Sequence, residues 1–260
     1  MRAVTVHETR FVDLDGAHNF RDLGGLPTID GGETRWGVMY RSDALHHLEP
    51  ADVERLLELG MRTVIDLRSS VELERTGRGP LEATSIGWVH APLTHVTHGE
   101  AAAQVLPPAL AEGDLGRHYV ESLAERTETL AEVITHLATP EYVPAVFHCT
   151  AGKDRTGMVT ALVLSLVGVA DDVIVEDYTL TDERMTLVME RIRASGDFPA
   201  QLAPVAASVA RAEATSMVTF LDALARTYGG AAGWARAAGL GDDVIASLHQ
   251  ALVKPRTPRE

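Results

Sequence analysis

The stretch His148-Cys149-Thr150-Ala151-Gly152-Lys153-Asp154-Arg155-Thr156-Gly157 decides how this chain is interpreted. It lies between an apolar run at residues 143–148 and another at 156–167, which predict a short strand before it and a buried helix after it. Loop residues in this position can turn successive backbone N–H groups inward, and the helix adds its positive N-terminal end. The stretch therefore predicts an anion-binding loop made of Thr150, Ala151, Gly152, Lys153, Asp154 and Arg155.

The side chains of this loop suit phosphate chemistry. Arg155 offers a planar fork of donors that fits two phosphate oxygens. Cys149 is expected at the base of the loop, where positive potential favours the thiolate, and a thiolate facing a bound phosphate can attack phosphorus in line. The Cys-x5-Arg-Thr pattern alone is weak, but His148 before it, Gly152 within it and Gly157 directly after it make coincidence improbable. The alternative is that Cys149 is only a small buried hydrophobic residue.

Strands and helices alternate along the first two thirds of the chain. This order predicts an α/β fold with a central, mainly parallel sheet flanked by helices. Residues 94–115 have no clear period and are expected to form a loop. The strands are expected at 38–41, 61–67, 86–91 and 143–148, and the helices at 50–59, 119–138 and 156–167.

The last third reads as helical. No strand is apparent from Asp171 onward, and the apolar spacing predicts helices over 171–195, 199–228, 231–238 and 242–253. The chain shows no internal repeat and no low-complexity linker, so a single domain over residues 1–260 is expected.

Composition narrows the function. With 37 acidic residues against 23 Lys and Arg, the formal charge of −14 argues against a nucleic-acid partner. The single cysteine excludes an intramolecular disulfide and a multi-cysteine metal site, and we predict neither a metal nor a cofactor.

The longest nearly apolar run, Met158 to Ala170, is too short to cross a bilayer, and the first residues lack a signal peptide's apolar region. A cytoplasmic protein is expected, or one secreted without a signal peptide.

The loop resembles the signature loop of the cysteine-based protein tyrosine phosphatase superfamily. With the pair Lys153-Asp154 inside it, the loop most resembles the signature loop of a bacterial branch of that superfamily. The resemblance extends from about residue 19 to about residue 253. Its other stretches are Asn19–Gly25, Tyr40–Asp43, Ile65–Ser69, Asp177–Thr181 and the tail from Phe220 to Leu240.

The resemblance implies a reaction in two steps. Cys149 would attack the phosphate to form a cysteinyl-phosphate, which water would then hydrolyse. Arg155 and the loop amides would stabilise the phosphate oxygens, and Thr156 would donate to the thiolate as it leaves. His148 would order the loop through hydrogen bonds. In the resembled branch, helices such as those expected at about 185–225 form a lid over the site.

Two carboxyl groups could protonate the leaving oxygen, which is the usual task of a positioned aspartate. Asp154 lies in the loop itself, where its alternative role is to rigidify the loop. Asp66 ends a predicted strand, and its alternative role is an ion pair with an arginine that orders the site. No Trp-Pro-Asp segment is present. The sequence favours Asp154 slightly.

Substrate and rival functions stay open at this point. A lysine at the position of Lys153 also occurs in phosphatases that accept phosphoinositides, where it meets a further phosphate. The predicted partners are therefore phosphorylated proteins (on tyrosine, with serine and threonine also considered) or phosphoinositides. The alternatives are a phosphatase of small metabolites or inositol phosphates, a non-catalytic phosphate-binding module, and a rhodanese-type sulfur transferase. The oligomeric state is not predicted.

Overall fold

The computed structural model describes residues 10–93, 108–195 and 210–254. Its main sheet has the strand order β1-β3-β6-β4-β5, in which β3, β6, β4 and β5 run parallel and β1 runs antiparallel at one edge. The predicted α/β class with a mainly parallel sheet is thus confirmed. The strands are β1 (Arg21–Asp22), β3 (Met39–Ser42), β6 (Ala145–His148), β4 (Thr63–Asp66) and β5 (Gly87–His90).

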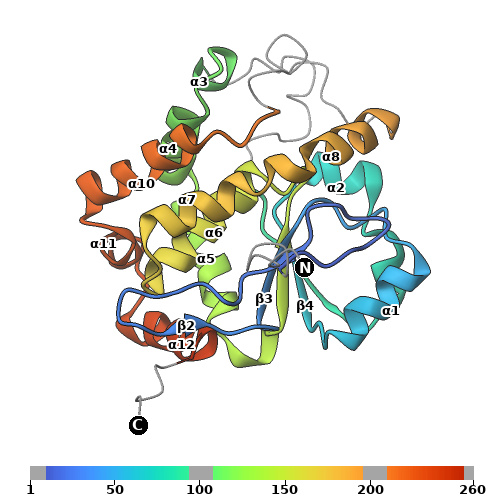
Figure 1. The fold of residues 1–260 in the computed structure, drawn as a ribbon, viewed down its shortest axis with the longest axis horizontal. Helices are drawn as coiled ribbons and strands as arrows, with labels where there is room; N and C mark the ends of the chain where they lie inside the picture. Colours follow the sequence, from blue (N-terminus) through green and yellow to red (C-terminus); the bar gives the residue numbers. More distant parts are fainter. Residues whose placement is uncertain (1–9, 94–107, 196–209, 255–260) are drawn as a thin grey trace, which may run out of the picture.

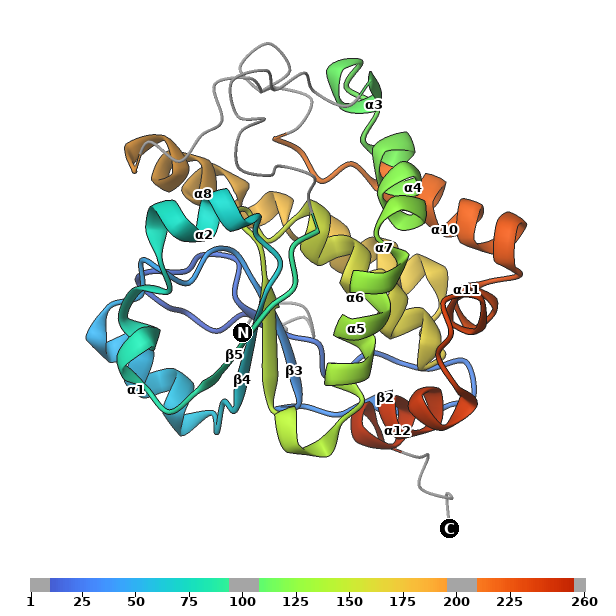
Figure 2. The same cartoon turned by 180° about the vertical axis from the view of Figure 1, so that it is seen from behind.

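Helices cover both faces of this sheet. Figures 1 and 2 show α1 (Pro50–Glu58) on one side, and α5 (Thr127–Leu137) and α6 (Asp154–Leu166) on the other. Successive residues of a strand point to opposite faces, so the apolar strand residues divide between two cores. The larger core, on the side of α5 and α6, takes Met39, Ile65, Ala145 and Phe147, and the smaller takes Tyr40, Val64 and Val146.

The structure breaks one predicted helix. The single helix expected over 119–138 is two helices, α4 (Leu115–Glu125) and α5, because Arg126 between them leaves helical geometry with φ −118° and ψ 21°. The break lets the two pieces pack on different partners, α4 against α10 (Ala214–Tyr228) and α5 against α6. The helical spacing of apolar residues continues across the break, so the sequence pattern does not show that the packing partner changes there.

The helix expected over 171–195 is also divided, into α7 (Asp171–Thr179) and α8 (Asp182–Ala194). The expectation of no strand after Asp171 is wrong: β7 (Val253–Lys254) pairs antiparallel with β2 (Glu33–Thr34). A strand of two residues is too short to carry a period, so its sequence could not show it.

The other helical segments follow the expected order. Of the helix expected over 199–228, the described part is helical from residue 214, as α10, whereas residues 210–213 are not helical. Residues 196–209 lie outside the described residues, as do 94–107 of the expected loop. The described end of that expected loop is partly helical instead: it contains the short helix α3 (Pro108–Ala111), and α4 already begins at Leu115. None of the helices in the three described ranges is long and apolar enough to cross a membrane. The remaining elements are α2 (Ser70–Thr76), α11 (Ala231–Ala237), α12 (Asp242–Leu252) and the 3-10 turns Gly79–Ala83 and Pro140–Tyr142.

Candidate active site

The loop between β6 and α6 lies where three parallel strands end together. Ser42 of β3 and Asp66 of β4 are both in register with His148 of β6, and Cys149 follows directly. The carboxyl ends of parallel strands form the ligand-binding edge of open α/β sheets. All the predicted phosphate-binding residues, 150–155, lie in this loop and the first turn of α6.

Cys149 is buried at the base of the loop, with only 1% of its surface exposed. The Thr156 hydroxyl donates a hydrogen bond to Cys149 Sγ over 3.2 Å. Thr156 lies in the first turn of α6, so the sulfur is also close to the positive end of that helix. The sulfur thus faces a hydroxyl donor and a helix N-terminus.

Arg155 forms a bidentate ion pair with Glu72 of α2. The distances are 2.7 Å from Nη1 to Oε2 and 3.0 Å from Nη2 to Oε1. The Thr150 hydroxyl donates to the same carboxylate. Burial favours a higher pKa for Glu72, but Arg155 outweighs burial and holds that pKa well below its usual range. Glu72 is therefore a carboxylate that fixes the plane of the Arg155 guanidinium.

Sequence reasoning missed Glu72, although a local signal was present. Ser69 and Glu72 form a capping box: Ser69 Oγ accepts from the Glu72 N–H at 3.2 Å, and Glu72 Oε2 accepts from the Ser69 N–H at 2.8 Å. The Ser-x-x-Glu pattern is the sequence mark of this motif. It predicts the start of α2, but not that the same carboxylate reaches Arg155.

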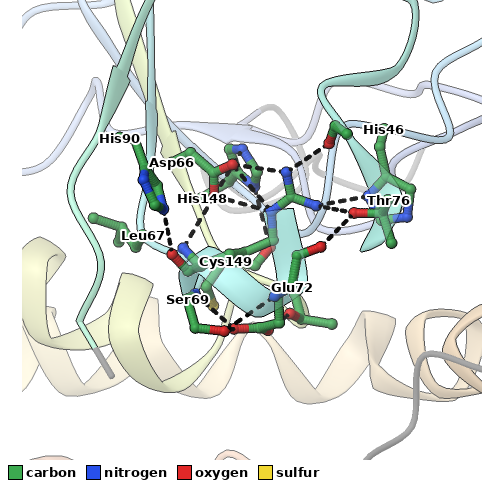
Figure 3. A network of polar contacts seen from close by, with 12 residues as sticks. His46, Asp66, Leu67, Ser69, Glu72, Thr76, His90, His148 and Cys149 are labelled. Carbon is green, nitrogen blue, oxygen red and sulfur yellow. Dashed lines mark hydrogen bonds and ion pairs between the residues drawn. The ribbon is translucent and has the colours of Figure 1, made fainter. Parts of the chain in front are cut away.

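Asp66 lies near the loop but is held by Arg68. Figure 3 shows Asp66 and His148 in one network of polar contacts. The Arg68 guanidinium donates to Asp66 Oδ2 from Nη2 at 2.7 Å and to Oδ1 from Nε at 2.9 Å. The same guanidinium contacts His46 and Thr76. Burial favours a higher pKa for Asp66, but His148 and Arg68 together lower it below its ordinary value. This geometry matches the alternative role predicted for Asp66, an ion pair with an arginine that orders the site.

His148 contacts the backbone of the loop. Its Nδ1 lies 3.1 Å from the carbonyl oxygen of Cys149, and its Nε2 lies 3.7 Å from Asp66 Oδ1. Burial lowers the pKa of His148. In the neutral ring Nδ1 must carry the proton, because a carbonyl oxygen can only accept. His148 therefore ties the first carbonyl of the loop to the sheet.

Asp154 is the more accessible of the two candidate acids, with 33% of its side chain exposed. Its Oδ1 accepts from the Tyr119 hydroxyl at 2.5 Å, and that hydroxyl also bonds to the Tyr178 hydroxyl at 2.7 Å. Two helices, α4 and α7, thus fix the position of a carboxyl group that still reaches solvent.

Lys153 lies in the loop as predicted, but it is not an exposed cation. Only 1% of its side chain is exposed. Its Nζ lies 3.3 Å from Asp154 Oδ1 and donates to the carbonyl oxygen of Arg211 at 3.1 Å. In this arrangement Lys153 binds the loop to the segment that leads into α10.

Close packing surrounds the middle of the loop. Gly152 has φ +67°, and a Cβ atom there would lie 2.6 Å from backbone atoms of Ser42 and Asp43, so only glycine fits. Ala151 packs against an apolar cluster on α8, made of Met185, Val188, Met189 and Ile192. Within the described ranges, no three His, Cys, Asp or Glu side chains are grouped to hold a metal ion.

Comparison with known proteins agrees with this geometry. The model of the tyrosine phosphatase family matches residues 12–254. The triple specificity protein phosphatase PtpB of Mycobacterium tuberculosis is 30% identical over 277 aligned positions, which cover 93% of this chain and 98% of PtpB. A protein of Cupriavidus necator described as a tyrosine-protein phosphatase is 34% identical, covering 78% of this chain and 76% of its own. A tyrosine-protein phosphatase of Nostoc commune is 28% identical over 80% of this chain and 71% of its own. The chain belongs to the tyrosine phosphatase family, and it is a protein tyrosine phosphatase.

Proposed function

We propose that this phosphatase uses Cys149 as its nucleophile and needs no metal ion. The thiolate attacks phosphorus, the ester oxygen leaves with a proton, and a cysteinyl-phosphate forms. Water then attacks phosphorus, and the thiolate leaves. The observation that carries the proposal is the 3.2 Å hydrogen bond from Thr156 to Cys149 Sγ, because a donor to the sulfur stabilises it both as nucleophile and as leaving group.

In this proposal Arg155 holds the phosphate oxygens. Its guanidinium is fixed by Glu72 in the ion pair described above, so the phosphate meets an already oriented fork. Electrostatic stabilisation by preorganised donors is commonly the largest contribution to such catalysis. The −14 charge of the chain means that this attraction is local, made by Arg155, the loop amides and the N-terminus of α6.

Asp154 is the general acid in this proposal, and Asp66 is a positioning residue. The partial exposure of Asp154 supports its role, because the donor must reach the leaving oxygen of a bound substrate. The complete burial of Asp66 and its bidentate pair with Arg68 argue against the same role for Asp66. A carboxyl group with a lowered pKa that is chelated by a guanidinium is a poor proton donor.

Phosphotyrosine in proteins is the proposed principal substrate, with phosphoserine and phosphothreonine as further ones. The three relatives are named for tyrosine or triple specificity phosphatases, which supports this order. The prediction for phosphoinositides depended on Lys153 as an added cation. The buried position of Lys153 argues against that use unless its contact with Arg211 opens.

The predicted lid over about 185–225 stays a prediction. Both α8 and α10 are helical as expected, but residues 196–209 between them lie outside the described residues. The apolar face of α8 contacts Ala151, which supports α8 as the part of this region that covers the loop.

Hydrolysis of p-nitrophenyl phosphate by the wild type and by Cys149→Ser, each with EDTA, tests the mechanism. We expect full wild-type activity with EDTA and none for the serine variant. Activity that survives in Cys149→Ser, or that disappears with EDTA in the wild type, would sink the mechanism. Phosphotyrosine, phosphoserine and phosphothreonine peptides, phosphoinositides and inositol phosphates, compared by kcat/KM, then test the substrate order.

A further inference from the structure

The orientation of the signature loop depends on where its carbonyl groups point. In a planar trans peptide the C=O of one residue and the N–H of the next point in opposite directions. A loop therefore directs its N–H groups at an anion only when its carbonyls are held on the far side. In this structure each carbonyl from Cys149 to Lys153 accepts a hydrogen bond, and the middle three, Thr150 to Gly152, accept it from residues far away in the sequence. The donors are His148 Nδ1, the Ala44 N–H, Asn19 Nδ2, Arg41 Nη2 and the Gly157 N–H.

Asn19 supplies two of these bonds from one side chain. Its Nδ2 donates to the carbonyl of Gly152 at 3.1 Å and to that of Ala151 at 3.3 Å. Its Oδ1 accepts from Arg21 Nη1 at 2.5 Å, which fixes the direction of the amide group. Its backbone N–H donates to Asp43 Oδ1 at 2.9 Å. Asn19 is thus itself held on two sides.

Arg41 supplies the third bond, and Asp177 holds Arg41. One end of the guanidinium donates from Nη2 to the Gly152 carbonyl at 2.8 Å, and Nη1 contacts Asp177 Oδ2 at 2.6 Å. Arg41 and Asp177 are completely buried. A planar fork of this kind places its two partners in one fixed geometry, which a lysine cannot reproduce.

We propose that Asn19 and Arg41, the latter held by Asp177, are positioning residues that set the peptide planes of the signature loop. They touch neither the sulfur nor the guanidinium of Arg155. Their bonds fix the Ala151 and Gly152 carbonyls outward, and so direct the N–H groups of Gly152 and Lys153 to the inside of the loop. The inference rests on the proposed function, in that the inside of this loop is the phosphate site.

Two substitutions, with a third as control, test this role. Asn19→Ala removes two loop bonds, and Arg41→Lys keeps the charge but cannot hold Asp177 and Gly152 together. Arg10→Lys is the matched control, because Arg10 contacts Asp177 Oδ1 at 2.9 Å and, among the described contacts, makes none with the loop. For each protein, circular dichroism and thermal melting show whether it is folded. The readouts are kcat, KM, the affinity for orthovanadate and the rate of iodoacetamide alkylation of Cys149, the only cysteine.

We expect Asn19→Ala and Arg41→Lys to bind orthovanadate roughly 10- to 100-fold more weakly, the range for losing one or two hydrogen bonds, some of them charge-assisted. Their alkylation should slow, and kcat should fall. Arg10→Lys should keep its orthovanadate affinity within about threefold at a comparable loss of melting temperature.

Folded Asn19→Ala and Arg41→Lys with wild-type orthovanadate affinity would overturn the inference. Equal losses in Arg10→Lys would do the same, because the effect would then follow stability alone. If Arg41→Lys does not fold, Asn19→Ala still decides. Failure of the wild type to bind orthovanadate would instead contradict the proposed function, so the two failures are distinguishable.

Discussion

Replacing Glu72 by glutamine tests whether this carboxylate orients Arg155, the arginine proposed to bind the phosphate. Glu72 Oε2 accepts from Arg155 Nη1 at 2.7 Å, and Oε1 accepts from Arg155 Nη2 at 3.0 Å. A glutamine has the same shape but only one oxygen. Whichever way its amide turns, an N–H group faces one of the two arginine donors. Glu72→Gln therefore removes at least one charge-assisted hydrogen bond to Arg155 and the charge itself.

The size of the effect follows from burial. The Arg155 and Glu72 side chains are 17% and 29% exposed, so solvent screens the pair only partly. A hydrogen bond between charged groups in such a place contributes about 1.5–3 kcal/mol. If that energy is what holds Arg155 ready for the transition state, kcat/KM should fall about 10- to 150-fold. The assay is steady-state hydrolysis of p-nitrophenyl phosphate, together with inhibition by orthovanadate.

Two controls separate orientation from folding. Ser69→Ala removes the hydroxyl of the capping box, which accepts from the Glu72 N–H and donates to Glu72 Oε2 at 2.8 Å, but it leaves the carboxylate and both of its bonds to Arg155. It should cost about 1 kcal/mol of stability and less activity than Glu72→Gln. Glu128→Gln changes an exposed acid in the first turn of α5 and should leave kcat/KM unchanged. The reasoning is refuted if Glu72→Gln keeps or exceeds the wild-type kcat/KM, because Glu72 would then only compete with phosphate for Arg155.

Three further predictions concern the acid, the core and the loop. Asp154→Asn should lose more kcat as the leaving group becomes more basic, whereas Asp66→Asn should lose similar activity on all aryl phosphates; a constant loss for Asp154→Asn would exclude it as the acid. Asp177→Asn should lower the free energy of unfolding by about 3–5 kcal/mol at pH 7, measured in urea, because it leaves buried arginines uncompensated. Burial by itself would raise the pKa of Asp177, but Arg21, Arg41 and Arg10 outweigh burial and hold that pKa well below its usual range. The stabilisation by the Asp177 carboxylate is therefore fully present above its pKa in the unfolded chain, about 3.9, and is lost as the pH falls below that value. The difference in unfolding free energy between the wild type and Asp177→Asn should thus shrink by about 1 kcal/mol between pH 7 and pH 3. A difference that stays constant would contradict the lowered pKa of Asp177. Gly152→Ala should abolish activity and lower the melting temperature, since its Cβ meets backbone at 2.6 Å, and wild-type turnover by this variant would contradict the described loop conformation.

Much of the fold could be predicted from local patterns. Apolar runs bounded by turn residues mark β4 and β6, and the proline and glycine around α1 mark its ends. The break between α4 and α5 at Arg126 could not be predicted, because α4 packs against α10, which lies more than 80 residues away in the sequence. The same holds for β7, whose pairing with β2 joins residues more than 200 positions apart in the sequence.

The candidate site divides in the same way. Cys149, Arg155 and Thr156 could be predicted together because they lie in one continuous segment, the loop and the first turn of α6. Glu72 could not, since a capping box predicts a helix start and says nothing of what the carboxylate meets in space. The stretches around Asn19 and Arg41 were visible only as a resemblance. Their physical meaning, hydrogen bonds to the loop carbonyls, needed the tertiary structure.

The cluster around Asp177 has a consequence for how the enzyme matures. Arg10, Arg21 and Arg41 come from the first part of the chain, and Asp177 comes after the whole signature loop. During synthesis Cys149, the proposed nucleophile, emerges before Asp177, the carboxylate proposed to complete the support of its loop. These contacts span 136 residues and more, and such distant contacts form late because closing long loops costs entropy. A nascent or truncated chain that ends before α7 would contain every residue of the catalytic loop and still lack its support. We therefore expect phosphatase activity to appear only once α7 has been made and Asp177 can pair with Arg41.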